Sequence, residues 1–258
     1  MKKSIALIGS PNCGKTSLFN LLTGLNHKVG NFPGITVDKK VGTWKGSHNS
    51  YSVFDLPGTY SLHPKSPEEQ VVVDYLNTED KSKLPDVALV VIDQTNLRRN
   101  LLLFSQVADL GLPIVAVLNM SDLAEKRGVK IDTEKFKALT GAEAVSINAR
   151  KGENIDVLEQ AVNQAIPTAI NFCRNKQVYL ETISKAADLQ YQKEAHQVLK
   201  REVLDRYEII DELLKQVLVK GEKKTLVDAF DKVLLHPCLL YTSPSPRDIS
   251  GSRMPSSA

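Results

Sequence analysis

The chain has 258 residues, of which 42% are hydrophobic and 24% charged, and its formal net charge is +3. These values are ordinary for a soluble globular protein, and the scattered lysines and arginines argue against a nucleic-acid binder that depends on phosphate contacts. Three widely separated cysteines with no C-x-x-C pair indicate neither a disulfide framework nor a zinc site. No apolar window approaches the roughly 18 residues that a membrane span requires.

Strand-like and helix-like segments alternate over the first 166 residues, which is the pattern of βα units. The runs at 87–92 and 114–118 are almost wholly apolar, as expected for parallel strands buried on both faces, whereas the polar run at 37–46 is typical of an edge strand. We expect an α/β fold: a doubly wound, mostly parallel six-stranded sheet that binds ligands at the carboxyl ends of its strands. The predicted strands are 4–9, 37–46, 51–56, 86–93, 113–120 and 142–147, and the predicted helices lie near 14–23, 66–77, 95–110, 132–140 and 153–166.

Helical periodicity replaces the alternation after Pro167 and continues to about residue 236. One apolar stripe consists of Val203, Tyr207, Ile210, Leu214 and Val217, and Leu226, Phe230 and Val233 continue it beyond a break at Gly221. We therefore expect a nucleotide-binding domain over 1–166 and a small all-helical domain over 167–237. The Ser-, Pro- and Arg-rich segment 238–258 resembles vector- or adapter-derived sequence more than an evolved domain, and it is excluded from the fold prediction.

The strongest motif is GSPNCGKTS, which fits G-x4-G-K-[ST] and lies between a predicted strand and a predicted helix. A loop of this kind turns successive backbone N–H groups toward phosphates, and the start of the helix adds partial positive charge. Lys15 can reach the β- and γ-phosphates, and the Thr16 hydroxyl can ligate Mg²⁺. Nucleotide contacts are expected from Gly9, Ser10, Pro11, Asn12, Cys13, Gly14, Lys15, Thr16 and Ser17.

A second motif, NMSD, follows the apolar run that ends near residue 119 and indicates which base is bound. The Asp122 carboxylate can accept hydrogen bonds from the N1–H and N2–H₂ groups of guanine, a pair of donors that adenine lacks. Asn119 is expected to contact the other edge of the base. Met120 stands where lysine is usual, and its apolar stem can cover the base face. In the loop SINARKG, backbone N–H groups near Asn148, Ala149 and Arg150 are expected to meet the guanine O6.

A third motif, DLPG, ends a strand-like run and is typical of a loop that senses the γ-phosphate. Asp55 is expected to hold Mg²⁺ through water, and the Gly58 N–H is expected to face the γ-phosphate. Between this motif and the P-loop lies VGNFPGITVD, whose Thr36 is the candidate second hydroxyl ligand of Mg²⁺. Further nucleotide contacts are expected from Gly34, Ile35, Leu56 and Pro57.

The residues after Gly58 lack the glutamine that holds the attacking water in signalling GTPases. Thr59, Tyr60 and Ser61 follow instead, so no side chain supplies a general base and hydrolysis is expected to be slow.

Two longer stretches, GSPNCGKTSLFNLLTG with HKVGNFPGITVDKKVG and DRYEIIDELLKQV with KKTLVDAFDKVLLHP, resemble the FeoB family of prokaryotic ferrous iron transport proteins over about residues 3 to 237. The resemblance implies a GTP-hydrolysing G domain and a helical domain like a guanine-nucleotide-dissociation inhibitor. Both would lie at the cytoplasmic face of the bacterial inner membrane and couple nucleotide state to Fe²⁺ uptake through a membrane domain absent here. Small cytosolic Feo proteins and a second copy of the chain are further implied partners, and no nucleic acid is expected.

The resemblance also implies stimulation by K⁺, with Asn12 as a ligand and the backbone carbonyls of Gly30 and Phe32 completing the site. A cation at this place would neutralise charge that develops in the transition state, as an arginine finger does elsewhere. The expected catalytic set is Asn12, Lys15, Thr36 and Gly58. Three alternatives stay open. Asn12 can be a turn residue that tolerates unusual backbone angles, and the chain can be a K⁺-dependent ribosome- or tRNA-associated GTPase or a sensor that needs a partner for turnover.

Overall fold

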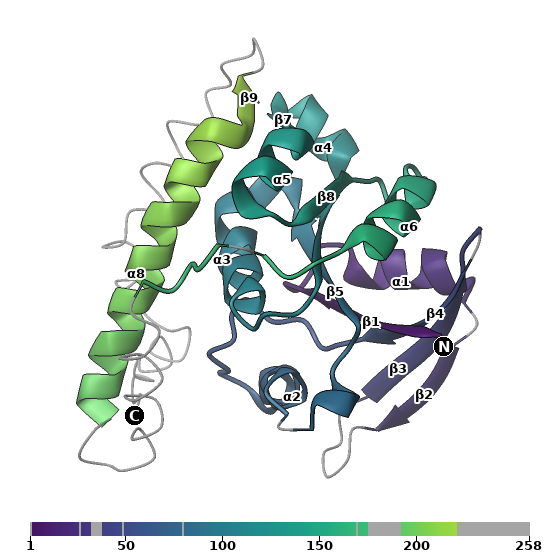
Figure 1. Cartoon of the computed structure of the whole chain (residues 1–258), viewed down its shortest axis with the longest axis horizontal. Coiled ribbons are helices and arrows are strands. Elements are labelled where there is room, and N and C mark those ends of the chain that lie inside the picture. Colours follow the sequence, from purple (N-terminus) through teal and green to yellow (C-terminus); the bar gives the residue numbers. More distant parts are fainter. Residues whose placement is uncertain are drawn as a thin grey trace, which may run out of the picture. The chain divides into compact units, whose positions relative to one another are not determined.

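The computed structural model describes residues 2–25, 27–31, 38–47, 49–78, 80–168, 170–174 and 192–220 (Figure 1). Its centre is a sheet in the order β2-β3-β4-β1-β5-β6-β8, in which β4, β1, β5, β6 and β8 are parallel and β2 and β3 are antiparallel to their neighbours. The strands are β1 (Lys3–Gly9), β2 (His27–Asn31), β3 (Asp38–Lys45), β4 (Ser50–Asp55), β5 (Val87–Asp93), β6 (Ile114–Asn119) and β8 (Glu143–Ser146).

The doubly wound, mostly parallel sheet expected from the sequence is confirmed, and it carries a seventh strand. All the predicted strands are present, but the expectation that 37–46 forms the edge is wrong, because β2 pairs antiparallel with β3 on its outer side. The β2 segment, HKVGN, has no β-branched run or alternation that would indicate a strand. Backbone pairing with β3, from Lys28 opposite Val41 to Gly30 opposite Lys39, forms it instead.

The predicted helices begin and end within two residues of expectation, and a short helix and two 3₁₀ turns were not predicted. Ser66 begins α2 by accepting a hydrogen bond from the Glu69 N–H at 3.3 Å, with Pro67 in the first turn, which is the expected chemistry of a helix start. The helices are α1 (Lys15–Thr23), α2 (Pro67–Leu76), α3 (Leu97–Ala108), α4 (Ser121–Lys126), α5 (Thr133–Thr140) and α6 (Ile155–Gln164), and the 3₁₀ turns are η1 (Lys81–Lys83) and η2 (Gln94–Asn96).

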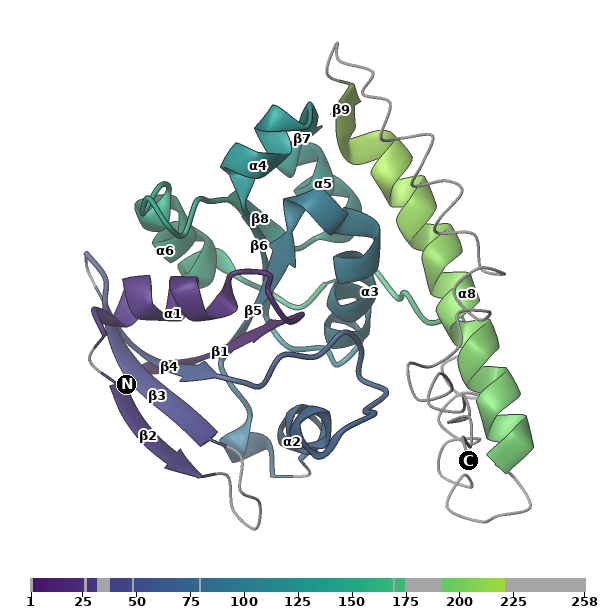
Figure 2. The ribbon, with the colours of Figure 1, turned by 180° about the vertical axis from the view of Figure 1, so that it is seen from behind.

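Helices cover both faces of the sheet and form two buried layers (Figures 1 and 2). Along β1, Ile5 and Leu7 point to the layer that contains α1 and α6, while Ala6 and Ile8 point to the layer of α2, α3 and α5. The strands β5 and β6 are buried on both sides, as their continuous apolar sequence predicts. This leaves the carboxyl ends of the parallel strands as the edge where loops can form a site.

Beyond Pro167, the described part of the chain contains the long helix α8 (Gln192–Val217), which packs against α3 and α5. The predicted apolar stripe faces these helices, because Ile210 and Val217 are buried and Val203, Tyr207 and Leu214 pack at the margin of the same core. The strand β9 (Leu218–Lys220) then pairs antiparallel with β7 (Val129–Ile131).

Residues Met1–Lys220 form one compact unit, so the described part of α8 belongs to the same unit as the sheet. The division at residues 166 and 167 stays a prediction, and Leu226, Phe230, Val233 and the segment 238–258 lie outside the described residues. In the part of the chain that the structure describes, no helix has both the length and the apolar character needed to cross a bilayer.

Candidate nucleotide-binding site

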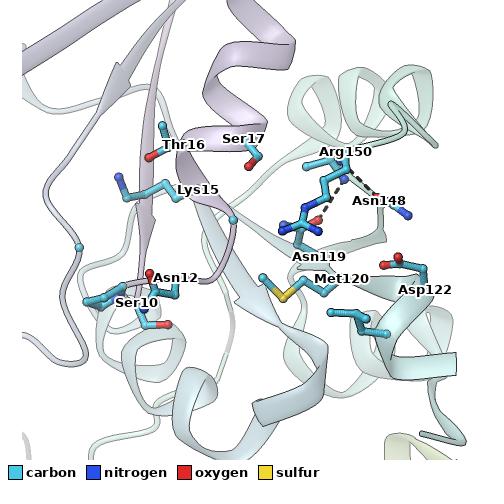
Figure 3. A pocket seen from close by; sticks show the side chains of 15 residues that line it. Ser10, Asn12, Lys15, Thr16, Ser17, Asn119, Met120, Asp122, Asn148 and Arg150 are labelled. Atoms are coloured by element: carbon cyan, nitrogen blue, oxygen red, sulfur yellow. Dashed lines mark hydrogen bonds between the residues drawn. The ribbon is translucent and has the colours of Figure 1, made fainter. Parts of the chain in front are cut away.

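A cavity of about 520 Å³ lies at the carboxyl ends of β1, β6 and β8. Figure 3 shows P-loop side chains such as Lys15 and Thr16 on one side and Asn119, Asp122 and Arg150 on the other. The structure therefore brings the phosphate motif and the two base motifs into one cavity. Its lining is Ser10, Pro11, Asn12, Gly14, Lys15, Thr16, Ser17, Gly58, Asn119, Met120, Asp122, Leu123, Asn148, Ala149 and Arg150.

The P-loop has the backbone geometry that wraps an anion. Gly14 has φ +87°, and a Cβ there would lie 2.2 Å from the Asn119 Nδ2 atom, so only glycine fits at this turn into α1. Asn12 has φ +65°, in the left-handed region that asparagine tolerates better than most residues. The first turn of α1 begins directly after this loop, where its unpaired N–H groups favour negative charge.

Lys15 and Asp55 form a buried ion pair next to the cavity, in which the Lys15 Nζ atom donates to the Asp55 Oδ1 atom. The side chains are 10% and 6% exposed, so both charges are held away from bulk water. Thr16 lines the cavity one residue further along α1. A hydroxyl and a carboxylate are hard oxygen donors of the kind that Mg²⁺ prefers, and the residues present therefore fit that ion.

The DLPG loop turns Thr59 inward. Thr59 is fully buried, its N–H donates to the Gly9 carbonyl at 3.1 Å, and its hydroxyl donates to the Ser61 carbonyl at 2.6 Å. Gly58 lies against Pro11, since a Cβ on Gly58 would be 3.2 Å from that ring. The backbone of this loop is thus fixed to the P-loop, while the side chain of Thr59, directly after Gly58, is engaged with the Ser61 carbonyl.

The base motifs are connected through Asn119. Its Nδ2 atom donates to the Cys13 carbonyl at 3.0 Å, and its Oδ1 atom accepts from the Ala149 N–H at 3.1 Å. Asp122 lies in the first turn of α4 and faces the cavity. Asn148 orders its own loop, because its Oδ1 atom accepts from the N–H groups of Arg150 and Lys151 at 3.2 and 3.3 Å.

Several predicted residues do not line the cavity. Cys13 is buried beneath it, and burial is the main cause that raises the pKa of its thiol, so the residue is suited to packing rather than to thiolate chemistry. Gly30 lies in β2 opposite Lys39. Gly9, Asp55, Leu56 and Pro57 are also absent from the lining, and Phe32, Gly34, Ile35 and Thr36 lie outside the described residues.

Sequence reasoning missed three residues around the cavity. Leu123 lines it beside Asp122. From α3, Asn100 accepts a hydrogen bond from the Ser10 hydroxyl at 2.6 Å, in a buried contact that supports the P-loop. Gln94, in η2, contacts the ends of β6 and β8. The contacts of Asn100 and Gln94 join segments far apart in the chain, and no local pattern signals them.

The described residues contain no group of three or more His, Cys, Asp and Glu side chains placed to hold a metal ion.

The family model of ferrous iron transport protein B (FeoB) matches residues 3–162 of this chain. The chain belongs to the FeoB family. A curated relative, the Fe(2+) transport protein A/Fe(2+) transporter FeoB fusion protein of Porphyromonas gingivalis, is 44% identical over 154 residues, or 60% of this chain and 18% of that protein. The chain spans about a fifth of the length of such relatives, as the FeoB of Leptospira biflexa also shows, with 41% identity over 163 residues and 23% of its length covered.

Solved FeoB structures share the fold. The cytosolic domain of L. pneumophila FeoB is 34% identical with a TM-score of 0.68, and the match covers 84% of this chain and all of that one. A GDP-bound mutant of the S. thermophilus FeoB G-domain is 30% identical with a TM-score of 0.67, covering 85% of this chain and all of that one. The fold is therefore that of a FeoB G domain, a GTPase fold.

Proposed function

We propose that this chain binds guanine nucleotides and hydrolyses GTP slowly as the G domain of a ferrous iron transporter. The observation that carries the proposal is the single cavity in which Lys15 and Thr16 of the P-loop face Asp122 and the Ala149 loop. Family membership and the GDP bound to the S. thermophilus relative support the same reading. Both findings favour the G domain of a transporter over a ribosome- or tRNA-associated GTPase.

The phosphates would be bound by the P-loop N–H groups and Lys15. Thr16 and Asp55 would hold Mg²⁺, which supplies charge neutralisation at the β- and γ-phosphates. Movement of Lys15 from the Asp55 carboxylate toward the phosphates would free that carboxylate for the metal side of the site. Thr36 is proposed as the second hydroxyl ligand, and the Gly58 N–H as the donor to the γ-phosphate.

Water activation is proposed to depend on loop backbone and on K⁺ rather than on residue 59. The buried Thr59 hydroxyl, engaged with the Ser61 carbonyl, supports this choice because it is not directed at the cavity. Asn12 lines the cavity from the P-loop and is the proposed side-chain ligand of K⁺, with carbonyls of Gly30 and Phe32. A monovalent cation there would offset charge on the leaving phosphate oxygens.

Coupling to Fe²⁺ uptake is proposed to run through α8 to a membrane part of the full-length protein. Helix α3 supports such a route, because it contacts the P-loop through Asn100 and α8 through Ser105, whose hydroxyl lies 3.3 Å from the Arg206 Nη1 atom. We further propose the inner-membrane location, and small Feo proteins and a second copy as partners, on the family relationship alone.

The deciding experiment is single-turnover GTP hydrolysis by the full chain in KCl and in NaCl at equal ionic strength. We expect faster hydrolysis in KCl for the wild type and equal rates in the two salts for Asn12→Ala. Equal wild-type rates would remove the K⁺ part of the proposal, and no hydrolysis in either salt would indicate a sensor that needs a partner.

Asn12→Gly is the matched control for the turn alternative. Glycine adopts φ +65° without strain but has no side-chain oxygen. If Asn12 only supports the turn, Asn12→Gly keeps the K⁺ response; if it is a ligand, Asn12→Gly loses the response while GDP still binds.

A further inference from the structure

Gln94 is a buried amide at the point where the two base-binding loops begin. It is the first residue of η2, directly after β5, and only 4% of it is exposed. Asp93 fixes this turn, because its carboxylate accepts from the N–H and the hydroxyl of Thr95, each at 2.8 Å. The turn packs against α4, the helix that carries Asp122.

The Gln94 Nε2 atom donates to β6, which neighbours β5, and to β8, which lies beyond β6 in the sheet. It lies 2.7 Å from the Leu118 carbonyl oxygen at the end of β6 and 3.1 Å from the Ser146 hydroxyl at the end of β8. Leu118 and Ser146 form the last residue pair between β6 and β8. Beyond them the chain diverges into the loop of Asn119 and Asp122 on one side and the loop of Asn148 and Ala149 on the other.

Backbone bonds and the side chains of Asn119 and Asn154 also contribute at this junction, and the Asn119 Oδ1 atom accepts from the Ala149 N–H at 3.1 Å. The Ile147 N–H donates to the Leu118 carbonyl at 2.8 Å, and the Asn154 amide donates to the Ser146 carbonyl at 2.7 Å. Gln94, directly after a third strand, therefore adds a side-chain contact, and its two N–H donors reach partners on β6 and β8. Guanine recognition needs these loops at a fixed spacing, because Asp122 and the Ala149 N–H approach the base from different strands.

We propose that Gln94 is a positioning residue for guanine recognition, which holds the ends of β6 and β8 together and thereby sets the spacing between Asp122 and the Ala149 N–H. The inference rests on the proposed guanine-nucleotide binding. A buried methionine of similar size would fill the same space but donate no hydrogen bond, so packing and positioning are separable at this site.

The test compares GDP with inosine diphosphate (IDP). IDP lacks the 2-amino group of guanine, which is one of the two proposed hydrogen-bond donors to the Asp122 carboxylate. Affinities of the full chain for both nucleotides are measured for wild type, Gln94→Met and Ser146→Ala. For Gln94→Met we expect GDP binding about sixfold weaker and IDP binding about twofold weaker, so that selectivity falls about threefold. Ser146→Ala removes one of the two contacts and should have a smaller effect in the same direction.

The double variant Gln94→Met/Ser146→Ala tests the positioning role through the ratio of GDP to IDP affinity, which a general loss of stability would not change. Because Gln94 and Ser146 act through one hydrogen bond, the loss of selectivity in the double variant should be less than the product of the single losses. Thr140→Val is the control: it removes a fully buried hydroxyl, bonded to the Phe136 carbonyl on α5, and should leave selectivity unchanged.

The outcomes separate the two claims. If wild type does not prefer GDP over IDP, the proposed guanine site is wrong. If wild type prefers GDP and both single variants keep the wild-type ratio, the guanine site stands and the role of Gln94 is overturned.

Discussion

The side-chain amide of Asn119 donates to the backbone carbonyl of Cys13 at 3.0 Å, so the loop that reads the base is bonded to the loop that wraps the phosphates. The same side chain accepts from the Ala149 N–H at 3.1 Å. One buried residue thus joins loops from the ends of β1, β6 and β8. Any change at Asn119 is expected to affect the base and phosphate parts of the site together.

Asn119→Ala is expected to weaken GDP binding roughly 100-fold, because it leaves a buried carbonyl and a buried N–H without their partner. Isothermal titration with GDP measures the effect. Asn163→Ala is the control, since it removes an exposed amide that bonds to the Tyr51 hydroxyl at 3.0 Å, outside the cavity lining. A loss below threefold for Asn119→Ala would show that the connection between the loops contributes little to binding.

Asp122→Asn is expected to change the base preference of the site from guanine to xanthine. The carboxylate accepts from two guanine donors, whereas an amide can accept from N1–H and donate to the xanthine C2 carbonyl. GDP affinity should fall at least about tenfold and xanthosine diphosphate affinity should rise by about the same factor. Competition between the two nucleotides measures the exchange. Equal losses for both would place Asp122 in a structural role at the start of α4.

The sequence was sufficient for the parts of the fold and site that depend on local patterns. Apolar runs located β5 and β6, and the P-loop spacing located the turn at Gly14. The sequence was insufficient where contacts with a distant segment of the chain determine the structure. The polar segment of β2 becomes a strand by pairing with β3. The contacts of Gln94 exist only because β5 ends next to β6 and within side-chain reach of the end of β8.

The buried charges of α8 are another feature that periodicity could not predict. Arg206 is 3% exposed, contacts the Asp109 Oδ2 atom at 2.8 Å, and donates from Nε to the Glu202 Oε1 atom. An apolar stripe predicts the buried face of a helix, but a charged residue within that face is buried only when other groups satisfy it. One of the partners here, Asp109, comes from a distant segment that helical periodicity does not reveal.

Arg206→Met is expected to destabilise the chain by about 3–5 kcal/mol, because it leaves the Glu202 and Asp109 carboxylates buried without their cation. Arg98→Met is the matched control: its pair with Asp211 is 50% and 42% exposed, and such pairs contribute about 1 kcal/mol or less. Urea unfolding of both variants gives the comparison. Equal losses would mean that the buried network contributes no more than the surface pair.

Acid destabilisation is expected to depend on His63, in the segment that follows Gly58. Burial lowers the pKa of His63 to about 4, and the charges of Arg206 and Lys65 act in the same direction. The Gln106 Nε2 atom lies 3.5 Å from its Nδ1 atom. His63 is therefore neutral in the folded chain at pH 7, while in the unfolded chain it titrates near the ordinary value of about 6.5.

Between those two pKa values the unfolded chain binds more protons, so the contribution of His63 to stability is present above about pH 6.5 and is lost as the pH falls toward 4. From pH 7 to pH 5 the wild type should lose about 1–2 kcal/mol more of its free energy of unfolding than His63→Gln, which cannot be protonated. Urea unfolding of both proteins at pH 7, 6 and 5 measures the difference. Parallel pH profiles would contradict the prediction, because a histidine already charged in the folded chain adds no such slope.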